Sequence, residues 1–111
     1  MNSKAGIQSG NDGSVQISGE MTFSTTPQLY REFEGHLRGE GPELSIDLGQ
    51  VDRADSSGLA LLLEWQAMAG QHKRILHITN APHTLMSLAK LCEADSLLDI
   101  SERGLELDAN S

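Results

Sequence analysis

Three times along this chain, a short segment with the apolar alternation or the short apolar run of a strand is followed by a segment with the apolar spacing of a helix. This order is typical of β-α-β units, in which right-handed crossovers pack helices on a sheet. At 111 residues the chain has the length of one such domain. We therefore predict a single α/β domain with helices packed on a β-sheet. The strand-like segments are Val15–Ile17, Leu44–Leu48 and Ile75–Ile78.

Capping and turn residues predict the first helix. Thr25 is expected to be its N-cap, Pro27 to lie in its first turn, and Gln28 to reach back to the cap. Gly39 and Gly41 then end it.

The later elements are predicted in the same way. Gly49–Asp55 is expected to be irregular, a second helix to run from near Ser57 to about Ala69, and Leu97–Ile100 to form a last short strand or turn. A third helix opens at Asn80-Ala81-Pro82, with one face made of Leu85, Leu88, Ala89 and Cys92.

Both ends of the chain are poor in apolar periodicity. Residues 1–13 predict a flexible N-terminal arm, or an edge strand around Ala5–Gln8, and residues 101–111 predict a flexible acidic tail. The folded domain is therefore placed at residues 14–100.

The formal net charge of −8 restricts the possible partners. Nucleic acid and anionic membrane surfaces are bound by clustered Lys and Arg, and the sequence has no such cluster, so we expect neither as a partner. The acidity either keeps the protein soluble or steers it toward a basic partner. The longest apolar run, Leu59–Leu63, is far shorter than the roughly 20 residues of a membrane span. With a lone Cys92 and no signal-peptide pattern, the protein is expected to be cytoplasmic.

The segment Asp55-Ser56-Ser57-Gly58 leads into the second helix. Asp or Ser there can accept hydrogen bonds from the free N–H groups of the first turn, and Gly58 permits a close backbone approach. A phosphate on Ser56 would be favoured by the helix dipole and opposed by the charge of Asp55. Two interpretations stay open at this point, ordinary capping and a phospho-acceptor or partner-contact loop.

The second helix is apolar nearly all round. Leu59, Leu62 and Leu63 form one stripe, which is enough to cover a sheet. The second stripe is therefore predicted either to contact a partner or to be covered by the N-terminal arm or the third helix. This stripe consists of Leu61, Trp65 and Met68.

The sequence contains no recognisable catalytic arrangement. It has no nucleophile-base motif, no paired carboxylates of familiar spacing and no G-x-x-x-x-G-K-[ST] phosphate loop. Its four histidines and one cysteine have no zinc-site spacing. We therefore expect a protein that is not an enzyme and that carries no metal or cofactor.

Taken together, Ile46-Asp47-Leu48, Val51-Asp52 and Asp55–Leu63 resemble the signature of the STAS domain family. That family includes anti-sigma factor antagonists and the small cytoplasmic STAS subunits of phospholipid-transporting ABC complexes. The runs Gly58–Leu63 and Leu88–Leu91 resemble the transport branch more closely. The resemblance spans about Ser14 to Ile100 and implies the STAS fold, a mixed β-sheet with helices packed on it.

The resemblance also implies a function. In the transport branch, the loop that matches the segment around Ser56 contacts an ABC-transporter ATPase subunit. The protein would then be a non-enzymatic subunit that supports the ATPase of a complex moving phospholipids between inner and outer membrane, which maintains outer-membrane lipid asymmetry. It would be held at the inner membrane through that partner, without inserting directly.

The alternative is an anti-sigma factor antagonist, in which Ser56 matches the residue that an anti-sigma factor kinase phosphorylates. The chain has Ser56-Ser57-Gly58 where the transport branch often has Thr-Gly-Gly, which keeps this alternative open.

Overall fold

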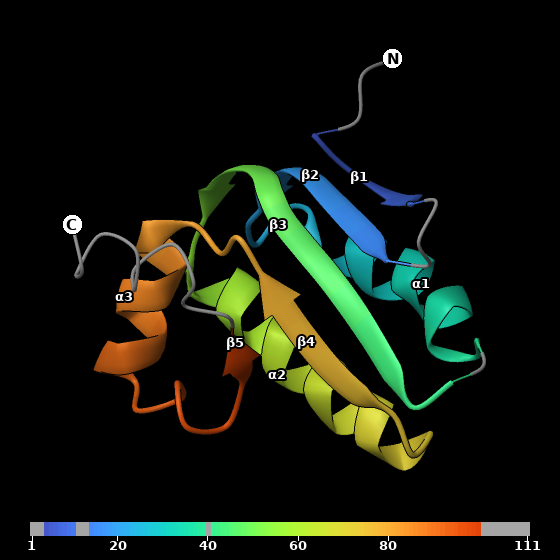
Figure 1. Ribbon diagram of the computed structural model, residues 1–111. Coiled ribbons are helices and arrows are strands. Elements are labelled where there is room, and N and C mark those ends of the chain that lie inside the picture. Colours follow the sequence, from blue (N-terminus) through green and yellow to red (C-terminus); the bar gives the residue numbers. More distant parts are fainter. Residues whose placement is uncertain (1–3, 11–13, 40, 101–111) are drawn as a thin grey trace, which may run out of the picture.

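A computed structural model describes residues 4–10, 14–39 and 41–100 of the chain. The predicted acidic tail, residues 101–111, lies outside the described residues. The elements, shown in Figure 1, are β1 (Ala5–Ser9), β2 (Val15–Met21), α1 (Thr26–Leu37), β3 (Glu43–Ala54), α2 (Ser56–Gln71), β4 (Ile75–Thr79), α3 (His83–Leu91) and β5 (Asp99–Ile100).

The sheet is mixed, as the sequence predicted. Its strands follow the order β1-β2-β3-β4-β5. β1 pairs with β2 in the antiparallel sense, and the other three pairings are parallel. Parallel neighbours need crossover connections, and α1 and α2 supply them between β2 and β3 and between β3 and β4.

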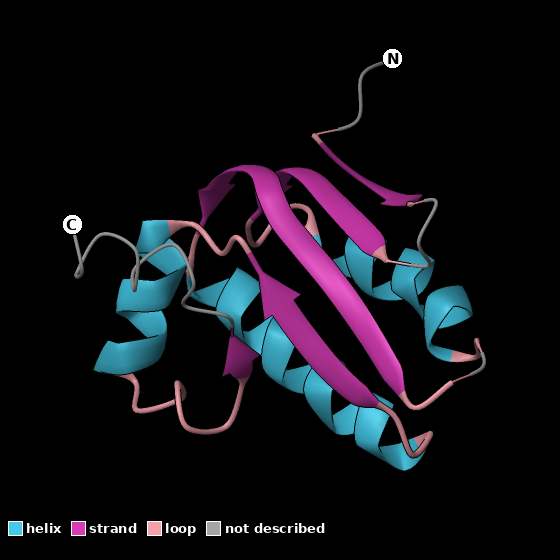
Figure 2. Cartoon of the chain, viewed as in Figure 1, coloured by secondary structure: helices cyan, strands magenta, loops and turns pink. Residues whose placement is uncertain are grey.

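Helices α1 and α2 lie against the same face of the sheet, with α3 beside α2, and none of the described helices covers the opposite face, here called the open face (Figures 1 and 2). Strand alternation explains this arrangement, because every second side chain points to the helices. On β4, Leu76 and Ile78 are fully buried, whereas His77 between them is half-buried on the open face. The hydrophobic core therefore lies between one face of the sheet and the helices.

The prediction of an irregular segment at Gly49–Asp55 is wrong, because β3 continues through this segment to Ala54. The pairing of β3 with β2 shifts register twice, between Gln16 and Ser18 and between Gly19 and Glu20. A bulge inserts an extra residue and interrupts the period-two pattern of a strand. The apolar alternation that marks the first half of β3 is lost for this reason.

The edge strand suggested by Ala5–Gln8 is present as β1. Its attachment depends on Gly19, which has φ +85° and lies against the β1 backbone. A Cβ at this position would lie 2.1 Å from the carbonyl oxygen of Lys4. That oxygen accepts a hydrogen bond of 2.8 Å from the N–H of Glu20, so β1 and β2 meet at backbone distance.

No helix within the described ranges is both long enough and apolar enough to cross a membrane.

Candidate functional site

Asp55 caps the N-terminal end of α2. Its Oδ1 accepts a hydrogen bond of 2.8 Å from the N–H of Ser57, and its backbone carbonyl accepts from the N–H groups of Gly58 and Leu59. These bonds satisfy donors that the first turn of a helix cannot pair internally. The capping role that the sequence offered for Asp or Ser is filled by Asp55.

The two serines of this loop remain available. Ser56 is the first residue of α2 and is exposed, and Ser57 is half-buried. Within residues 4–10, 14–39 and 41–100, neither hydroxyl has a hydrogen-bond partner. The Ser56 hydroxyl therefore faces outward beside the positive end of the α2 dipole.

Asp55 also joins α2 to the turn between β2 and α1. Its second carboxylate oxygen, Oδ2, accepts from the N–H of Phe23 at 3.2 Å. Its own N–H donates to the carbonyl of Met21 at 3.2 Å. One carboxylate thus holds two segments that are 32 residues apart in the sequence.

The turn that carries Phe23 is closed by its own threonines. The N–H of Thr22 donates to Thr25 Oγ1 at 2.9 Å, and this hydroxyl donates to the carbonyl of Glu20 at 2.8 Å. Both threonines are buried. Phe23, between them, has 81% of its surface exposed. A rigid turn therefore presents an aromatic side chain to solvent.

The capping bonds predicted for the start of α1 are wrong. Thr25 occupies the N-cap position, but its side chain makes no capping hydrogen bond because it is bound within the turn. Gln28 does not reach back to the cap either. Its Nε2 donates to the carbonyl of Ala5 and to Glu32.

Gly58 allows α2 to approach the end of β2. A Cβ on this residue would lie 2.6 Å from the carbonyl oxygen of Met21 and 3.0 Å from the Met21 Cβ. Real Cβ atoms do not approach backbone this closely, so a larger residue would displace the start of α2 from the sheet. The close approach predicted from the sequence is confirmed at this position.

A groove lies between the N-terminal halves of α1 and α2. Its volume is about 510 Å³, and its walls are mainly apolar. Phe23 is part of the lining, and Arg31 and Glu64 supply opposite charges. The residues that line it are Phe23, Thr26, Pro27, Tyr30, Arg31, Ser57, Ala60, Leu61 and Glu64.

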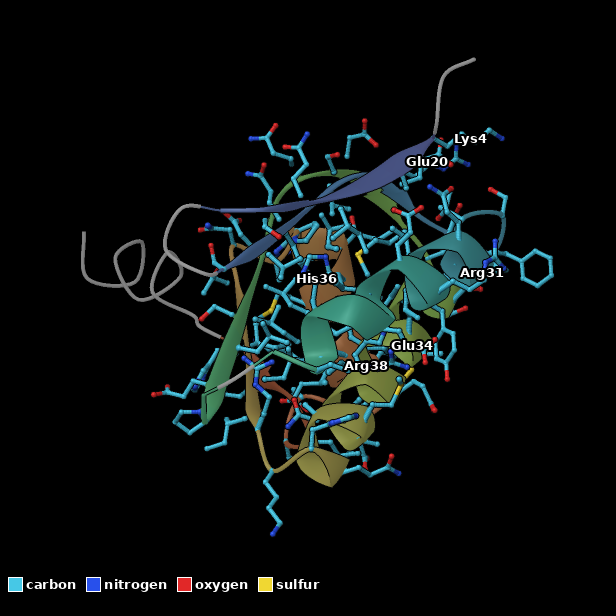
Figure 3. The ribbon with its side chains drawn as sticks, turned by 90° about the vertical axis from the view of Figure 1, so that its right-hand side faces the viewer. Lys4, Glu20, Arg31, Glu34, His36 and Arg38 are labelled. Atoms are coloured by element: carbon cyan, nitrogen blue, oxygen red, sulfur yellow. The ribbon has the colours of Figure 1, made fainter. Side chains whose placement is uncertain are left out.

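The other side of Phe23 is polar. A second hollow there is lined by charged residues of both signs, among them Lys4, Glu20, Arg53 and Asp55. Figure 3 shows Lys4 and Glu20 next to each other at one end of the β1–β2 pair, and it shows Arg31 on α1, apart from them. Phe23 is therefore an apolar projection between an apolar groove and a mixed-charge hollow.

The predicted contact helix is only partly at the surface. Trp65 is fully buried and stacks on Phe33 of α1, with ring centroids 4.1 Å apart and an interplanar angle of 29°. Leu61 is 6% exposed and Met68 is half-buried. Trp65 is thus not an exposed contact residue, because it packs against α1.

Two aromatic residues of this surface were not predicted from the sequence. Phe23 and Tyr30 are exposed, by 81% and 37%. The signal for Phe23 was a single aromatic within the small polar run Thr22–Thr26. Cys92, which was placed on the apolar face of α3, is exposed at the end of that helix.

The described part of the chain contains no group of three or more His, Cys, Asp or Glu side chains that could hold a metal ion.

Comparison with known proteins agrees with this architecture. A family model described as "Mlab, STAS domain" matches residues 7–99. The chain therefore belongs to the STAS domain family, and the predicted resemblance is confirmed. No curated protein matches the sequence.

Solved structures of STAS proteins share the fold. The anti-sigma factor antagonist SpoIIAA in its unphosphorylated form has a TM-score of 0.66 at 14% identity, covering 95% of this chain and 94% of its own. An anti-sigma factor antagonist from Mycobacterium paratuberculosis has a TM-score of 0.69 at 22% identity, with 86% and 84% covered. An anti-sigma-factor antagonist (STAS) domain protein from Planctomyces limnophilus has a TM-score of 0.68 at 15% identity, with 96% and 98% covered. At these identities the likeness shows the fold alone.

Proposed function

We propose that this chain is a non-enzymatic, MlaB-like STAS subunit that binds and supports the ATPase of an ABC complex. That complex would move phospholipids between the inner and outer membranes and so maintain outer-membrane lipid asymmetry. The family model, with its MlaB-type description, supports the transport branch. The observation that carries the binding role is Phe23, which is 81% exposed on a rigid turn beside Ser56.

The geometry suits docking with little rearrangement. Ordering a flexible loop on binding costs free energy, and a turn that is already held by hydrogen bonds avoids most of that cost. Asp55 fixes Phe23 and the start of α2 as one unit. Aromatic residues that enter a partner's pocket commonly carry much of the binding energy. In this proposal Phe23 is the anchor, and the α1–α2 groove receives an apolar side chain of the ATPase.

The proposal also fixes where the protein acts. The subunit would be cytoplasmic and would reach the inner membrane only through the ATPase. The partner-contact loop would consist of Asp55, Ser56, Ser57 and Gly58, with Leu61 forming part of the groove wall. Ser56 would contact the ATPase directly, and Asp55 would act by positioning Phe23.

A second candidate is an anti-sigma factor antagonist whose partner is an anti-sigma factor kinase. The observation that favours it is the outward hydroxyl of Ser56 at the first residue of α2. SpoIIAA has been solved both unphosphorylated and phosphorylated, and both forms share the fold of this chain. A phosphate on Ser56 would add charge and bulk beside the Phe23 anchor and would switch binding off.

The test is affinity purification of the tagged full-length chain from its native cells, with partners and Ser56 phosphate identified by mass spectrometry. We expect an ABC ATPase with its permease and an unmodified Ser56. Recovery of a kinase-like anti-sigma factor with phosphate on Ser56 would establish the alternative. Recovery of neither class would overturn the proposed function.

The site is tested separately with a matched pair of variants. Phe23→Ser removes the proposed anchor, and Leu91→Ser makes the same kind of change at an 80% exposed leucine at the end of α3. We expect Phe23→Ser to weaken ATPase binding about tenfold or more, and Leu91→Ser to leave it unchanged. Equal affinities for wild type and Phe23→Ser would exclude this site while leaving the function open.

A further inference from the structure

His77 lies on the open face of the sheet between two carboxylates from the neighbouring strands. Its Nε2 is 2.8 Å from Glu43 Oε1 on β3, and its Nδ1 is 2.5 Å from Asp99 Oδ2 on β5. The strand order places β4 between β3 and β5 (Figure 1). One imidazole ring therefore links three strands, on the face opposite to the core.

The two contacts together require a particular protonation state. A carboxylate oxygen only accepts hydrogen bonds, and a neutral imidazole has one N–H and one lone pair. The neutral ring can donate to only one of the two carboxylates, and its lone pair then faces the other. The imidazolium form has two N–H groups and satisfies both. Only the protonated ring can therefore donate to both carboxylates at the same time.

β5 depends on this link more than β3 does. β3 and β4 are paired over five positions, from Glu43 with Ile75 to Asp47 with Thr79. β5 has two residues, and its pairing consists of Asp99 opposite His77 and Ile100 opposite Ile78. A side-chain bond adds little to a long ladder and much to a short one. Loss of the His77–Asp99 bond is therefore expected to loosen β5 first.

The ring and its two carboxylate partners are all partly exposed to solvent. The His77 side chain is 31% exposed and those of Glu43 and Asp99 are 65% and 52% exposed. Asp47 is also on this face of β3, but its Oδ1 accepts from Gly49 and Asn80. In the described ranges, the charged groups that face the ring from the strands on either side are Glu43 and Asp99.

We propose that His77 is a proton-dependent clasp that holds β5 on the sheet. Its contribution is full while the imidazole carries both protons, and it is weaker once the ring is neutral and can donate to only one of the two carboxylates. The attachment of β5 would then be firmer in mildly acidic than in mildly alkaline conditions.

The experiment is amide hydrogen exchange of the full-length chain, followed by NMR at pH 5.5 and pH 8.0 and corrected for intrinsic exchange rates. We expect the protection of the β5 amides to fall by about twofold to fivefold at the higher pH, the range of an exposed ion pair. The amides of β3 should change much less. Equal protection of β5 at the two pH values would overturn the proposal.

Three variants separate the clasp from a merely structural histidine. His77→Gln should give β5 protection that does not depend on pH, and His83→Gln, an exposed histidine at the start of α3, should behave like wild type. Glu43→Gln is the decisive variant. A neutral His77 can donate to Asp99 and accept from the new amide, so protection should persist at pH 8.0. Loss equal to that of wild type would contradict the clasp.

Discussion

The two ends of α2 differ in whether the groups around them are bonded within the fold or exposed to solvent. Beyond the C-terminal end, the buried guanidinium of Arg74 donates to the carbonyls of His36, Leu37, Gly41 and Glu43 at 2.9–3.3 Å. At the N-terminal end, the Ser56 hydroxyl and the Phe23 ring face solvent. Beyond the C-terminal end, the hydrogen bonds of Arg74 are made within the protein and stabilise the fold. The other end is fixed in place but leaves its chemistry available to a partner.

This contrast separates stability from binding. Arg74 places a positive charge at the C-terminal end of α1, where carbonyl groups lack helical partners and the helix dipole is negative. Phe23 contributes little to the core because most of its surface is in water. Substitution of Arg74 is therefore expected to cost the most stability, and substitution of Phe23 or Asp55 to affect binding more than folding.

The largest effect is expected for Arg74→Met. It leaves four carbonyl groups without their charged donor in a buried position, so we expect the free energy of unfolding to fall by about 3 kcal/mol or more. Urea denaturation measures the change. Arg74→Lys keeps the charge but not the planar guanidinium, so its stability should lie between that of the wild type and that of Arg74→Met. A loss below about 1 kcal/mol for Arg74→Met would show that the two ends do not differ as described.

A smaller loss of stability is expected for Gly58→Ala. The new Cβ collides with the Met21 carbonyl, so the start of α2 must move, at a cost of about 2 kcal/mol. Gly70→Ala in the same helix is the matched control, because a Cβ there meets nothing within 4 Å. It should be neutral or stabilise the protein by up to ~1 kcal/mol. Similar results for the two glycines, by thermal or urea unfolding, would contradict the close approach.

The smallest loss of stability is expected for Asp55→Ala, about 1 kcal/mol for a lost N-cap. Binding should suffer more, because the N–H of Phe23 also loses its acceptor and the anchor is no longer held. Asp55→Asn keeps one carbonyl oxygen and should be intermediate. Calorimetric titration with the ATPase, alongside urea unfolding, compares the two effects. Unchanged affinity in Asp55→Ala would mean that Asp55 is a cap and nothing more.

The sequence predicted the fold class because strand and helix periods are local properties. Ile46 is buried where alternation placed it, and the predicted β-α-β order agrees with the parallel pairing of β3 and β4. β3 was predicted too short because its register shifts against β2 break the alternation, and such shifts depend on the partner strand. The fold could therefore be predicted wherever neighbouring residues determine it.

The candidate site was predicted only in part, for the same reason. The loop from Asp55 to Gly58 combines a cap and a close-approach glycine, which are local signals. The burial of Trp65 depends on Phe33, 32 positions earlier in the chain, and the position of Phe23 depends on the hydrogen bond that its N–H donates to Asp55. Neither long-range contact can be predicted from the residues that neighbour these aromatics in the sequence. The surplus apolar stripe of α2 was therefore predicted to contact a partner or to be covered by the N-terminal arm or α3, whereas its Trp65 packs against α1.

The stacked pair of Phe33 and Trp65 also makes the protein convenient to observe. Trp65 is the single tryptophan of the chain, so the indole emission comes from one place, the contact between α1 and α2. That ring is fully shielded from water in the folded protein and becomes hydrated on unfolding. A shift of the emission to longer wavelength would then report separation of the two helices without any added label.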